Sequence, residues 1–328
     1  MDTLLSKVQS LTRPEHHQRV IYTTTATTAL FALLAYSRHC YVEWHALGDS
    51  GVPRDVRGWL VNVVAHLVAR RDHRGVPAPY EKKKKEKKVT STSQDPKTQG
   101  EGDDSTTTIV LSARDEERYG PWSRVSYFAA AGFSLPTYAG ARPAVPTTVL
   151  PQRQTSHAAS PATLARQGAY LRAVAVANPA LFAVRPSALE SPKFDALWLV
   201  PSSSSSSSPG DNENGGGGDD DGKVVDPESV KWLPFRARGE TAHVHPEGSM
   251  HVCLSLVDAA EVVRRGWGER HMMSGVAGLL PWGYVLVYAP REGADGKGDW
   301  EVWKGIVLAA ARVVARSAGF EGEIVVPE

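Results

Sequence analysis

Cysteine and net charge are both scarce in this chain. Its 328 residues include only two cysteines, Cys40 and Cys253, and 37 basic against 36 acidic side chains give a formal net charge of +1. Two cysteines in such different settings, one beside an apolar segment and one in a strand-like run, exclude a disulfide framework and a cysteine-based zinc site. The dense basic run at residues 82–88 carries no interleaved aromatic residues. We therefore expect no nucleic-acid partner.

Two stretches hold too few apolar side chains to join a hydrophobic core. Residues 81–107 are rich in lysine, serine, threonine and glycine, and residues 202–222 hold a serine run followed by glycine and aspartate. Such segments cannot offset the entropy lost on ordering, so we predict two disordered loops. The predicted organisation is an anchor region (1–45), a linker with an amphipathic helix (46–80), the first loop (81–107) and a domain (108–328) that the second loop interrupts.

Long hydrophobic runs are also few, and the clearest one lies near the N-terminus. Eighteen uncharged residues, VIYTTTATTALFALLAYS, separate Arg19 from Arg38. A helix of that length reaches about 27 Å, which is close to the thickness of a bilayer core. Tyr36, Tyr41 and Trp44 would form an aromatic belt at its end. We predict a single-pass membrane anchor, with a cleaved signal or targeting peptide and a buried soluble helix as the alternatives.

A second helix is predicted over Gly58–Arg71. Its apolar residues recur at helical spacing (Leu60, Val63, Val64, Leu67 and Val68). With a tryptophan at its start and two arginines at its end, it could lie on a membrane surface or pack on the domain. The sequence leaves both open.

The remaining segments mix strands and helices. Thr108–Leu111 and Phe194–Pro201 read as strands, and Ser160-Pro161 reads as the N-cap and first residue of a helix that stops before Pro179. His243–Val257 alternates and reads as a hairpin that turns at Pro246–Gly248.

Three further elements are expected near the carboxyl end. They are a short helix capped by Asp258 and ended by Gly266, a buried strand over Trp282–Ala289, and a long helix capped by Asp299. Because the strands and helices do not alternate as βαβ units, the predicted fold class is α+β, with a single mixed core.

The chemistry is expected at a cluster of histidines. His243, His245 and His251 fall within nine positions, and residues two apart on a strand face the same side. After the turn, His251 would return opposite the first two. Such a cluster could hold zinc or iron, or it could supply a general base with a helper. Histidines satisfied by neighbours in the core are the third alternative.

A second motif, Gly266–His271, delivers an acid, a guanidinium and an imidazole in succession. Two glycines around Trp267 describe a tight turn with a large aromatic anchor, followed by Glu269, Arg270 and His271. The last two would suit polarising an enolate or carbonyl oxygen. The alternative is a purely structural role, in which the glycine ends a helix and the charged side chains that follow are solvated.

These motifs together resemble the fungal luciferase family. The similarity is carried by AHVHPEGSMHVCLSL, DAAEVVRRGWGERHMMSG and GYVLVYAPR, and it extends to GARPAVPTTVLPQRQT, SPKFDALWLVP and YVEWHALGDSGVPRDVRGWL. The luminous members of that family oxidise 3-hydroxyhispidin, an electron-rich pyrone, with O₂. The resemblance therefore implies an oxygenase that needs no metal and no organic cofactor.

Carried onto this chain, the resemblance implies a set of site residues. The implied catalytic residues are His243, His245, His251, Arg270, His271 and Tyr288, and the implied substrate-binding residues are Trp267, Glu269, Arg291 and Arg142. A histidine would take the enol proton and Arg270 would hold the oxyanion. The implied partners are a small-molecule substrate and O₂.

The luminous members differ at one point: the stretch before the third histidine is slightly longer there and carries a further histidine, whereas here it reads PEGSM. We therefore expect a reaction without light on a lipophilic phenol or pyrone at a membrane. The alternatives are a metal enzyme that uses the three histidines and a membrane-tethered binding module without catalysis.

Overall fold

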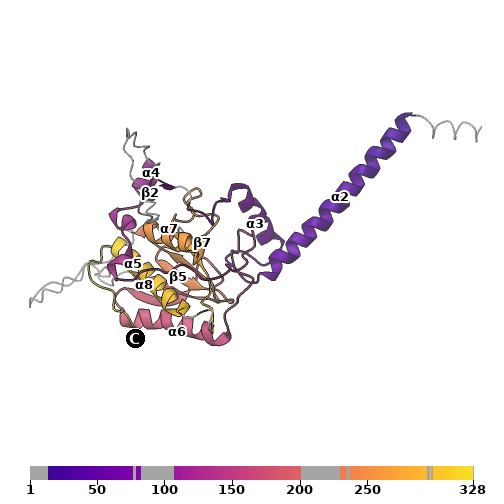
Figure 1. Ribbon diagram of the computed structural model, residues 1–328. Helices are drawn as coiled ribbons and strands as arrows, with labels where there is room; N and C mark the ends of the chain where they lie inside the picture. Colours follow the sequence, from indigo (N-terminus) through magenta and orange to yellow (C-terminus); the bar gives the residue numbers. More distant parts are fainter. Residues whose placement is uncertain are drawn as a thin grey trace, which may run out of the picture.

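The computed structural model describes residues 14–76, 79–82, 107–200, 230–234, 237–293, 296 and 298–327 (Figure 1). The predicted loop at 202–222 lies outside the described residues, as does most of the loop at 81–107. The ends of the first loop correct its predicted bounds, because Tyr80–Lys82 (β1) and Thr107–Ile109 (β2) pair as a two-stranded antiparallel ribbon. The strand predicted at Thr108–Leu111 thus begins one residue earlier and ends two residues earlier, at Ile109.

The largest element is a six-stranded antiparallel sheet with the order β3-β4-β5-β6-β8-β7. Its strands are Phe182–Pro186 (β3), Asp195–Leu199 (β4), Glu240–Val244 (β5), Met250–Cys253 (β6), Gly268–Arg270 (β7) and Tyr284–Val287 (β8). The predicted hairpin is present as β5 and β6, and Gly248 in its turn has a φ of +92°, which glycine adopts without strain. The predicted α+β class is confirmed.

Helices cover one face of this sheet. Asp299–Ser317 (α8) lies on β5 and β6, Pro161–Ala177 (α6) on β3 and β4, and Leu256–Arg265 (α7) on β7 and β8. Helices α6 and α8 also meet each other, with the rings of Tyr170 and Trp303 centred 6.1 Å apart. Two short helices, Pro121–Arg124 (η1) and Tyr127–Ala130 (α5), pack against α8 in this layer, and a third, Ala113–Glu116 (α4), precedes them in the chain. The other face of the sheet is left for the histidines.

The predicted start of α6 is confirmed, because the Ser160 hydroxyl accepts a hydrogen bond from the Thr163 amide. Two other predicted caps are wrong. Helix α7 begins at Leu256 with Ser255 as its cap, while the Asp258 carboxylate accepts from the Ser126 hydroxyl and the Tyr127 amide. Helix α8 is preceded by Gly298, and the carboxylate of Asp299 accepts hydrogen bonds from the Arg291 guanidinium. In both cases the carboxylate accepts hydrogen bonds from a residue outside its own helix and does not cap that helix.

The N-terminal segment forms one long helix, Pro14–Ala46 (α2), that projects away from the domain (Figure 1). It is long and apolar enough to span a membrane, and its apolar window is not packed inside the protein. A second helix, Val56–Val68 (α3), follows it and is capped by Asp55. At the foot of α2, the indole of Trp44 is buried and donates to the Leu150 carbonyl at 2.7 Å.

Candidate functional site

The three clustered histidines lie side by side on the face of the sheet opposite α8. His243 on β5 pairs directly with His251 on β6, and His245 follows two residues after His243, so that all three imidazoles share this face. Their ring centroids are 4.7 to 5.4 Å apart, and His271 joins them at 5.2 Å from His251. None of the four is more than 4% exposed. The predicted convergence of these histidines is therefore present in the structure.

The carboxylate of Glu240 orients the His243 imidazole by its contact with Nδ1. Its Nδ1 lies 2.6 Å from Glu240 Oε1. Glu240 also accepts from the Ser187 hydroxyl at 2.7 Å and from the Ala188 amide at 2.8 Å. Although burial raises the pKa of Glu240, the hydrogen bonds from His243 and Ser187 outweigh it and leave that pKa below its ordinary value. An ionised Glu240 thus fixes the imidazole with Nε2 turned away from it.

His245 is held in the same manner by the hairpin turn. Its Nδ1 lies 2.9 Å from the Ser249 hydroxyl and 3.4 Å from Glu247 Oε1. Its Nε2 is buried and has no hydrogen-bond partner among the described residues. Burial is the main cause that lowers the pKa of His245 below its ordinary value, so this imidazole is neutral near pH 7.

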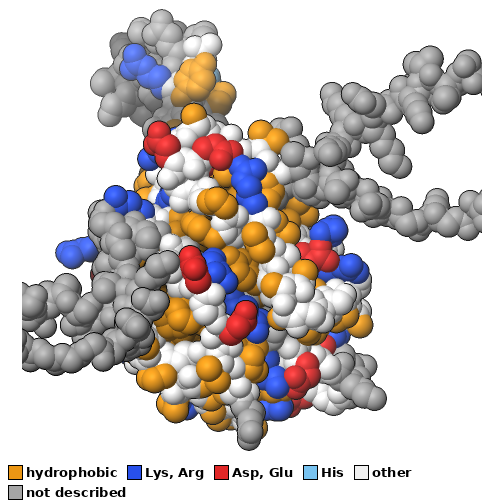
Figure 2. Space-filling model, turned by 90° about the vertical axis from the view of Figure 1, so that its left-hand side faces the viewer, with side chains coloured by type: hydrophobic (Ala, Val, Ile, Leu, Met, Phe, Trp, Pro, Cys, Tyr) orange, Lys and Arg blue, Asp and Glu red, His pale blue; other side chains and the backbone are white. Residues whose placement is uncertain are grey.

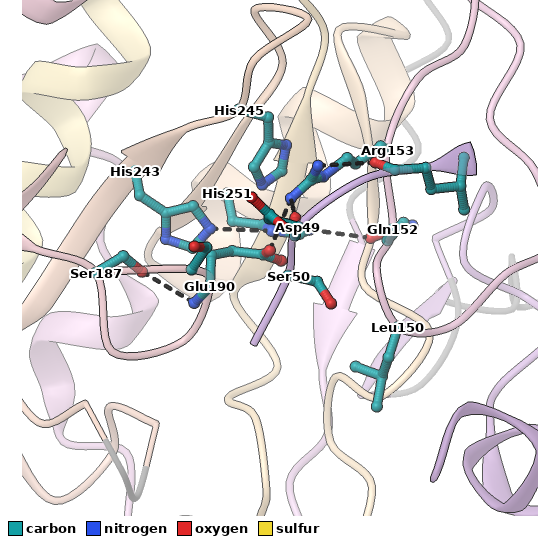
Figure 3. A network of polar contacts seen from close by, with 12 residues as sticks. Asp49, Ser50, Leu150, Gln152, Arg153, Ser187, Glu190, His243, His245 and His251 are labelled. Carbon is teal, nitrogen blue, oxygen red and sulfur yellow. Dashed lines mark hydrogen bonds and ion pairs between the residues drawn. The ribbon is translucent and has the colours of Figure 1, made fainter. Parts of the chain in front are cut away.

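Glu190 approaches the cluster from the loop between β3 and β4. The backbone amide of Glu190 donates to the Ser187 hydroxyl at 3.0 Å, and the guanidinium of Arg153 donates to the Glu190 carboxylate at 2.9 Å. Figure 3 shows this carboxylate among the three imidazoles. One ligand atom each from Glu190, His243, His245 and His251 lies within 4.8 Å of the others. These four side chains could hold a metal ion.

The remaining two imidazoles are also neutral. Burial, reinforced by neighbouring histidines, lowers the pKa of His251 well below its ordinary value and that of His271 to about 3. The Nδ1 of His271 accepts from the Met273 amide at 3.0 Å. His251 stacks on the Tyr284 ring at 4.9 Å and turns Nε2 toward the amide oxygen of Gln152 at 3.3 Å. His245, His251 and His271 are therefore proton acceptors near pH 7.

Glu269 and Tyr288 form a second layer beside the cluster. Glu269 is buried and accepts from Arg74 Nε at 2.7 Å, from Gln152 Nε2 at 3.1 Å and from the Tyr288 hydroxyl at 3.3 Å. Desolvation is the first cause that raises the pKa of Tyr288, followed by the Glu269 charge. Gln152 thus links Glu269, and through Glu269 also Tyr288, to His251.

The other predicted site residues lie farther away. Arg270 is next to Glu269 on β7, so strand alternation turns it to the opposite face, and its guanidinium carbon lies 5.1 Å over the Trp282 ring. The Trp267 indole donates to the Pro136 carbonyl, and Arg142 donates to the Val263 carbonyl.

Arg291 forms a bidentate ion pair with Asp299 at 2.7 and 3.1 Å. It also lines a separate cavity of about 760 Å³ with His157 and Glu292. The substrate-binding roles implied for Trp267, Arg142 and Arg291 thus remain predictions on residues outside the cluster.

Four residues of the cluster were missed by the sequence analysis. Glu190 and Glu240 are separated by 50 positions and looked like ordinary surface acids, while Gln152 and Arg153 lie in a coil with no periodic signal. Their one available signal was the resemblance, since Gln152 and Arg153 stand in the quoted stretch GARPAVPTTVLPQRQT. The burial of three consecutive polar residues, Gln152 to Gln154, could have been recognised only in the fold.

A coil segment closes the site from outside. The carbonyl of Leu47 accepts from Arg153 Nη1 at 2.9 Å, and the carbonyl of Asp49 accepts from the same guanidinium. A Cβ added to Gly51 would lie 2.0 Å from the Leu189 carbonyl oxygen, so residues 47–51 rest directly on the loop that carries Glu190. We refer to residues 47–51 as the cover. It follows immediately after the end of α2.

Comparison with known proteins points to one family. A family model described as the Luciferase domain matches residues 238–310. Luciferases of Armillaria gallica and Armillaria mellea are each 40% identical over 60 residues, which are 17% of this chain and 22% of theirs. The luciferase of Neonothopanus nambi is 35% identical over 66 residues, 19% of this chain and 24% of its own. No solved structure matches this chain.

The similarity is partial. The chain spans only about a quarter or less of the length of these curated relatives. The match nevertheless includes the four clustered histidines together with Glu240 and Glu247. The predicted resemblance to fungal luciferases is confirmed for the segment that forms β5 to α8.

Proposed function

We propose that this protein is a luciferase-like oxygenase that oxidises a lipophilic, electron-rich phenol or pyrone at a membrane, without emitting light. The observation that carries the proposal is the closed cluster of buried imidazoles inside the segment that matches the luciferase domain. Oxygen chemistry on an enolisable ring begins with removal of a proton, and a neutral buried imidazole is a suitable base.

His245 is the best candidate for that base. Its Nδ1 faces the Ser249 hydroxyl and Glu247, which favours the tautomer that carries its proton on Nδ1. The lone pair of Nε2 then points into the cluster with no partner among the described residues. Unlike the other clustered imidazoles, His245 therefore needs to break no hydrogen bond at Nε2 to accept a proton.

The proposed step conserves atoms and electrons. The imidazole takes the proton of the ring hydroxyl, and the resulting anion transfers two electrons to O₂ as a carbon–oxygen bond forms. The distal oxygen, now at the peroxide level, takes the proton back from the imidazolium. The product is a substrate hydroperoxide, and the base is regenerated.

Glu247 supports this role because it connects His245 to the surface. Its side chain is 17% exposed, whereas that of His245 is fully buried. Despite the burial that raises it, the pKa of Glu247 is lowered by its hydrogen bond from His245, so that it stays ionised and stabilises an imidazolium. The position of Arg270 does not favour the oxyanion role implied by the resemblance. Arg153, which lies beside the cluster, is the better candidate for that role.

The cover accounts for how a membrane-derived substrate would reach the cluster. In this structure the four imidazoles are closed off, and residues 47–51 lie over Glu190 and Arg153. The cover is joined to the foot of α2, and Trp44 ties that foot to the coil that carries Gln152 and Arg153. We propose that the cover opens toward the bilayer, so that a lipophilic substrate enters beside α2.

The membrane part of the proposal rests on α2 and α3. Helix α3 turns its small and polar residues Gly58, Asn62 and Ala65 to the domain. Its large apolar residues are exposed: Val56, Leu60, Val61, Val63, Val64, Leu67 and Val68. On the face turned away from α2, by contrast, charged side chains of both signs are scattered among hydrophobic ones (Figure 2). An exposed apolar helix beside a candidate anchor suits the surface of a bilayer.

The sequence of the β5–β6 hairpin is the reason for proposing a reaction without light. Residues Pro246–Ser249 form the turn between β5 and β6, and this short turn lacks the additional histidine expected in luminous relatives. The turn residues Glu247 and Ser249 are instead occupied with His245.

Oxygen uptake tests the proposal. The full-length protein in detergent is incubated with a panel of electron-rich pyrones and phenols, while oxygen consumption, ¹⁸O incorporation and light are recorded. We expect consumption of oxygen with incorporation of ¹⁸O into at least one product, without light. Tight binding of a panel member without oxygen consumption would favour the membrane-tethered binding module instead.

A further inference from the structure

We propose that Glu190, His243, His245 and His251 bind one divalent first-row transition-metal ion. The inference goes beyond the proposed function. In the metal-bound protein His245 Nε2 is a ligand, so the role of base proposed for this atom applies to the metal-free protein. The binding site itself is argued from geometry alone. One ligand atom of each residue lies within 4.8 Å of the other three, and all four side chains are buried. Ligands about 2.0–2.2 Å from an ion lie about 3–4.4 Å apart. The widest pair therefore has to close by less than about 1 Å.

The outer contacts of the imidazoles match those of metal-binding histidines. A ligating histidine generally donates its second ring N–H to a carboxylate or another acceptor, which fixes the tautomer and aims the ligating nitrogen. His243 Nδ1 has Glu240 at 2.6 Å, and His245 Nδ1 has the Ser249 hydroxyl at 2.9 Å with Glu247 beyond it. Both Nε2 atoms are thereby turned inward.

The two inward Nε2 atoms lack hydrogen-bond partners at ordinary distance among the described residues. His245 Nε2 is buried without a hydrogen-bond partner in the described part of the chain. His243 Nε2 has only a long contact of 3.3 Å with His251 Nδ1. Buried nitrogen atoms normally find a partner. A metal ion at the centre of the four residues would satisfy both.

Charge also favours a cation at this position. Three carboxylates, Glu190, Glu240 and Glu247, surround the imidazoles, and the guanidinium of Arg153 pairs with one of them. Three carboxylates therefore stand against one guanidinium in a buried setting, and a divalent ion would offset this excess of acidic groups. Arg153 bonds one oxygen of Glu190 and leaves the other available as a ligand.

The donor types indicate which ion fits. Three imidazole nitrogens and one carboxylate oxygen, with no sulfur, suit iron(II), manganese(II), cobalt(II) or zinc(II) rather than calcium or magnesium. Cys253 lies nearby but donates to the Glu240 carbonyl at 3.9 Å, so its thiol stays outside the set. Four protein ligands leave a coordination position for a small molecule on an ion that accepts five or six.

Metal titration of the full-length protein tests the inference. The protein in detergent is stripped with a chelator and titrated with Co²⁺ and Zn²⁺ by calorimetry and by the visible spectrum of cobalt. We expect one equivalent to bind, with cobalt absorption bands typical of nitrogen and oxygen ligation. Uptake of much less than one equivalent of either ion would overturn the inference.

Variants assign the site. His245→Ala and Glu190→Gln should each weaken binding at least tenfold, and Glu240→Gln should weaken it about 10–100-fold through the orientation of His243. His157→Asn and Glu292→Gln, which alter an exposed histidine and an acid outside the cluster, are the matched controls and should bind as the wild type does. Unchanged affinity in Glu190→Gln and Glu240→Gln, with unfolding temperatures near that of the wild type, would also overturn the inference.

The outcomes separate this inference from the proposed function. A stripped protein that binds no cobalt but still consumes oxygen with substrate would refute the metal site and leave the oxygenase standing. A protein that binds one ion but oxidises no member of the panel would leave the metal site standing and refute the oxygenase.

Discussion

His271 illustrates how burial, reinforced by neighbouring histidines, controls a titrating group in this protein. It lies on the rim of the cluster, 5.2 Å from the ring of His251, and is 4% exposed. Desolvation lowers its pKa to about 3, whereas a histidine in an unfolded chain titrates near about 6.5. Between these two values the unfolded chain binds a proton that the folded chain does not bind.

The stability of the folded protein should therefore fall in mild acid. The contribution of His271 is fully present above about pH 6.5 and is lost as the pH falls toward 3. The loss at pH 4.5 amounts to about 2–3 kcal/mol. The lowered pKa values of His245 and His251 act in the same direction. Chemical denaturation of the chelator-treated protein at pH 7, 5.5 and 4.5 measures the effect. A free energy of unfolding that stays constant over this range would contradict it.

The sequence predicted that the histidines converge, but it did not predict the acidic and basic side chains that contact them. His243, His245 and His251 are close in sequence and alternate on a strand, so their convergence follows from local geometry. Glu190 reaches the histidines only because β4 lies beside β5 and the loop before β4 folds back. Glu240 lies on β5 three residues before His243, and it contacts His243 beside an irregularity in the register of β4 and β5. Pairing of strands across a long insertion leaves no local signal. The same holds for Arg153, whose burial depends on the cover.

At the scale of elements, those with strong end signals were predicted best. Helix α6 has a serine cap followed by proline, and the β5–β6 hairpin has alternation and a glycine turn. The strands β3 and β7 were not predicted. β3 is an edge strand that ends in Pro186, which is tolerated only at an edge, and β7 has three residues, too few to display a period. Both depend on their neighbours for their conformation.

The contact between the cover and the Glu190 loop gives a prediction at this scale. Gly51→Ala places a Cβ 2.0 Å from the Leu189 carbonyl oxygen. The cover must then move away, and we expect a loss of about 1–3 kcal/mol in the free energy of unfolding. Gly168→Ala is the matched control, because Gly168 lies within α6 where a Cβ meets nothing closer than 3.5 Å.

The control should gain about 0.5–1 kcal/mol, because alanine favours a helix over glycine. Urea denaturation of both variants measures the difference. Equal stability of Gly51→Ala and the wild type would show that the cover does not rest on this loop.

At the scale of the whole molecule, the apolar N-terminus and α3 should act together. Deletion of residues 1–37 removes most of α2 but keeps Trp44, so the domain should stay folded and lose its tight membrane association. Carbonate extraction, followed by separation of membrane and supernatant, measures the change. Full-length protein in the supernatant would contradict a spanning anchor.

Residual binding of the truncated protein would come from α3. Val64→Asp combined with Leu67→Asp adds charge to its exposed apolar face, and this variant of the truncated protein should release from vesicles. If the charged variant binds vesicles as well as its parent, another surface holds the domain on the membrane.

The central claim is that the buried histidine cluster is the reactive site, and rate measurements on histidine variants test it most directly. Oxygen consumption is compared for the wild type, His243→Ala, His245→Ala and the exposed control His157→Asn, with the substrate found by the oxygen-uptake panel. The account predicts that each cluster variant loses roughly 10²–10⁴-fold in rate. The control should retain the wild-type rate, and circular dichroism should show that all four proteins are folded. A folded His245→Ala protein that oxidises the substrate as fast as the wild type would contradict the account.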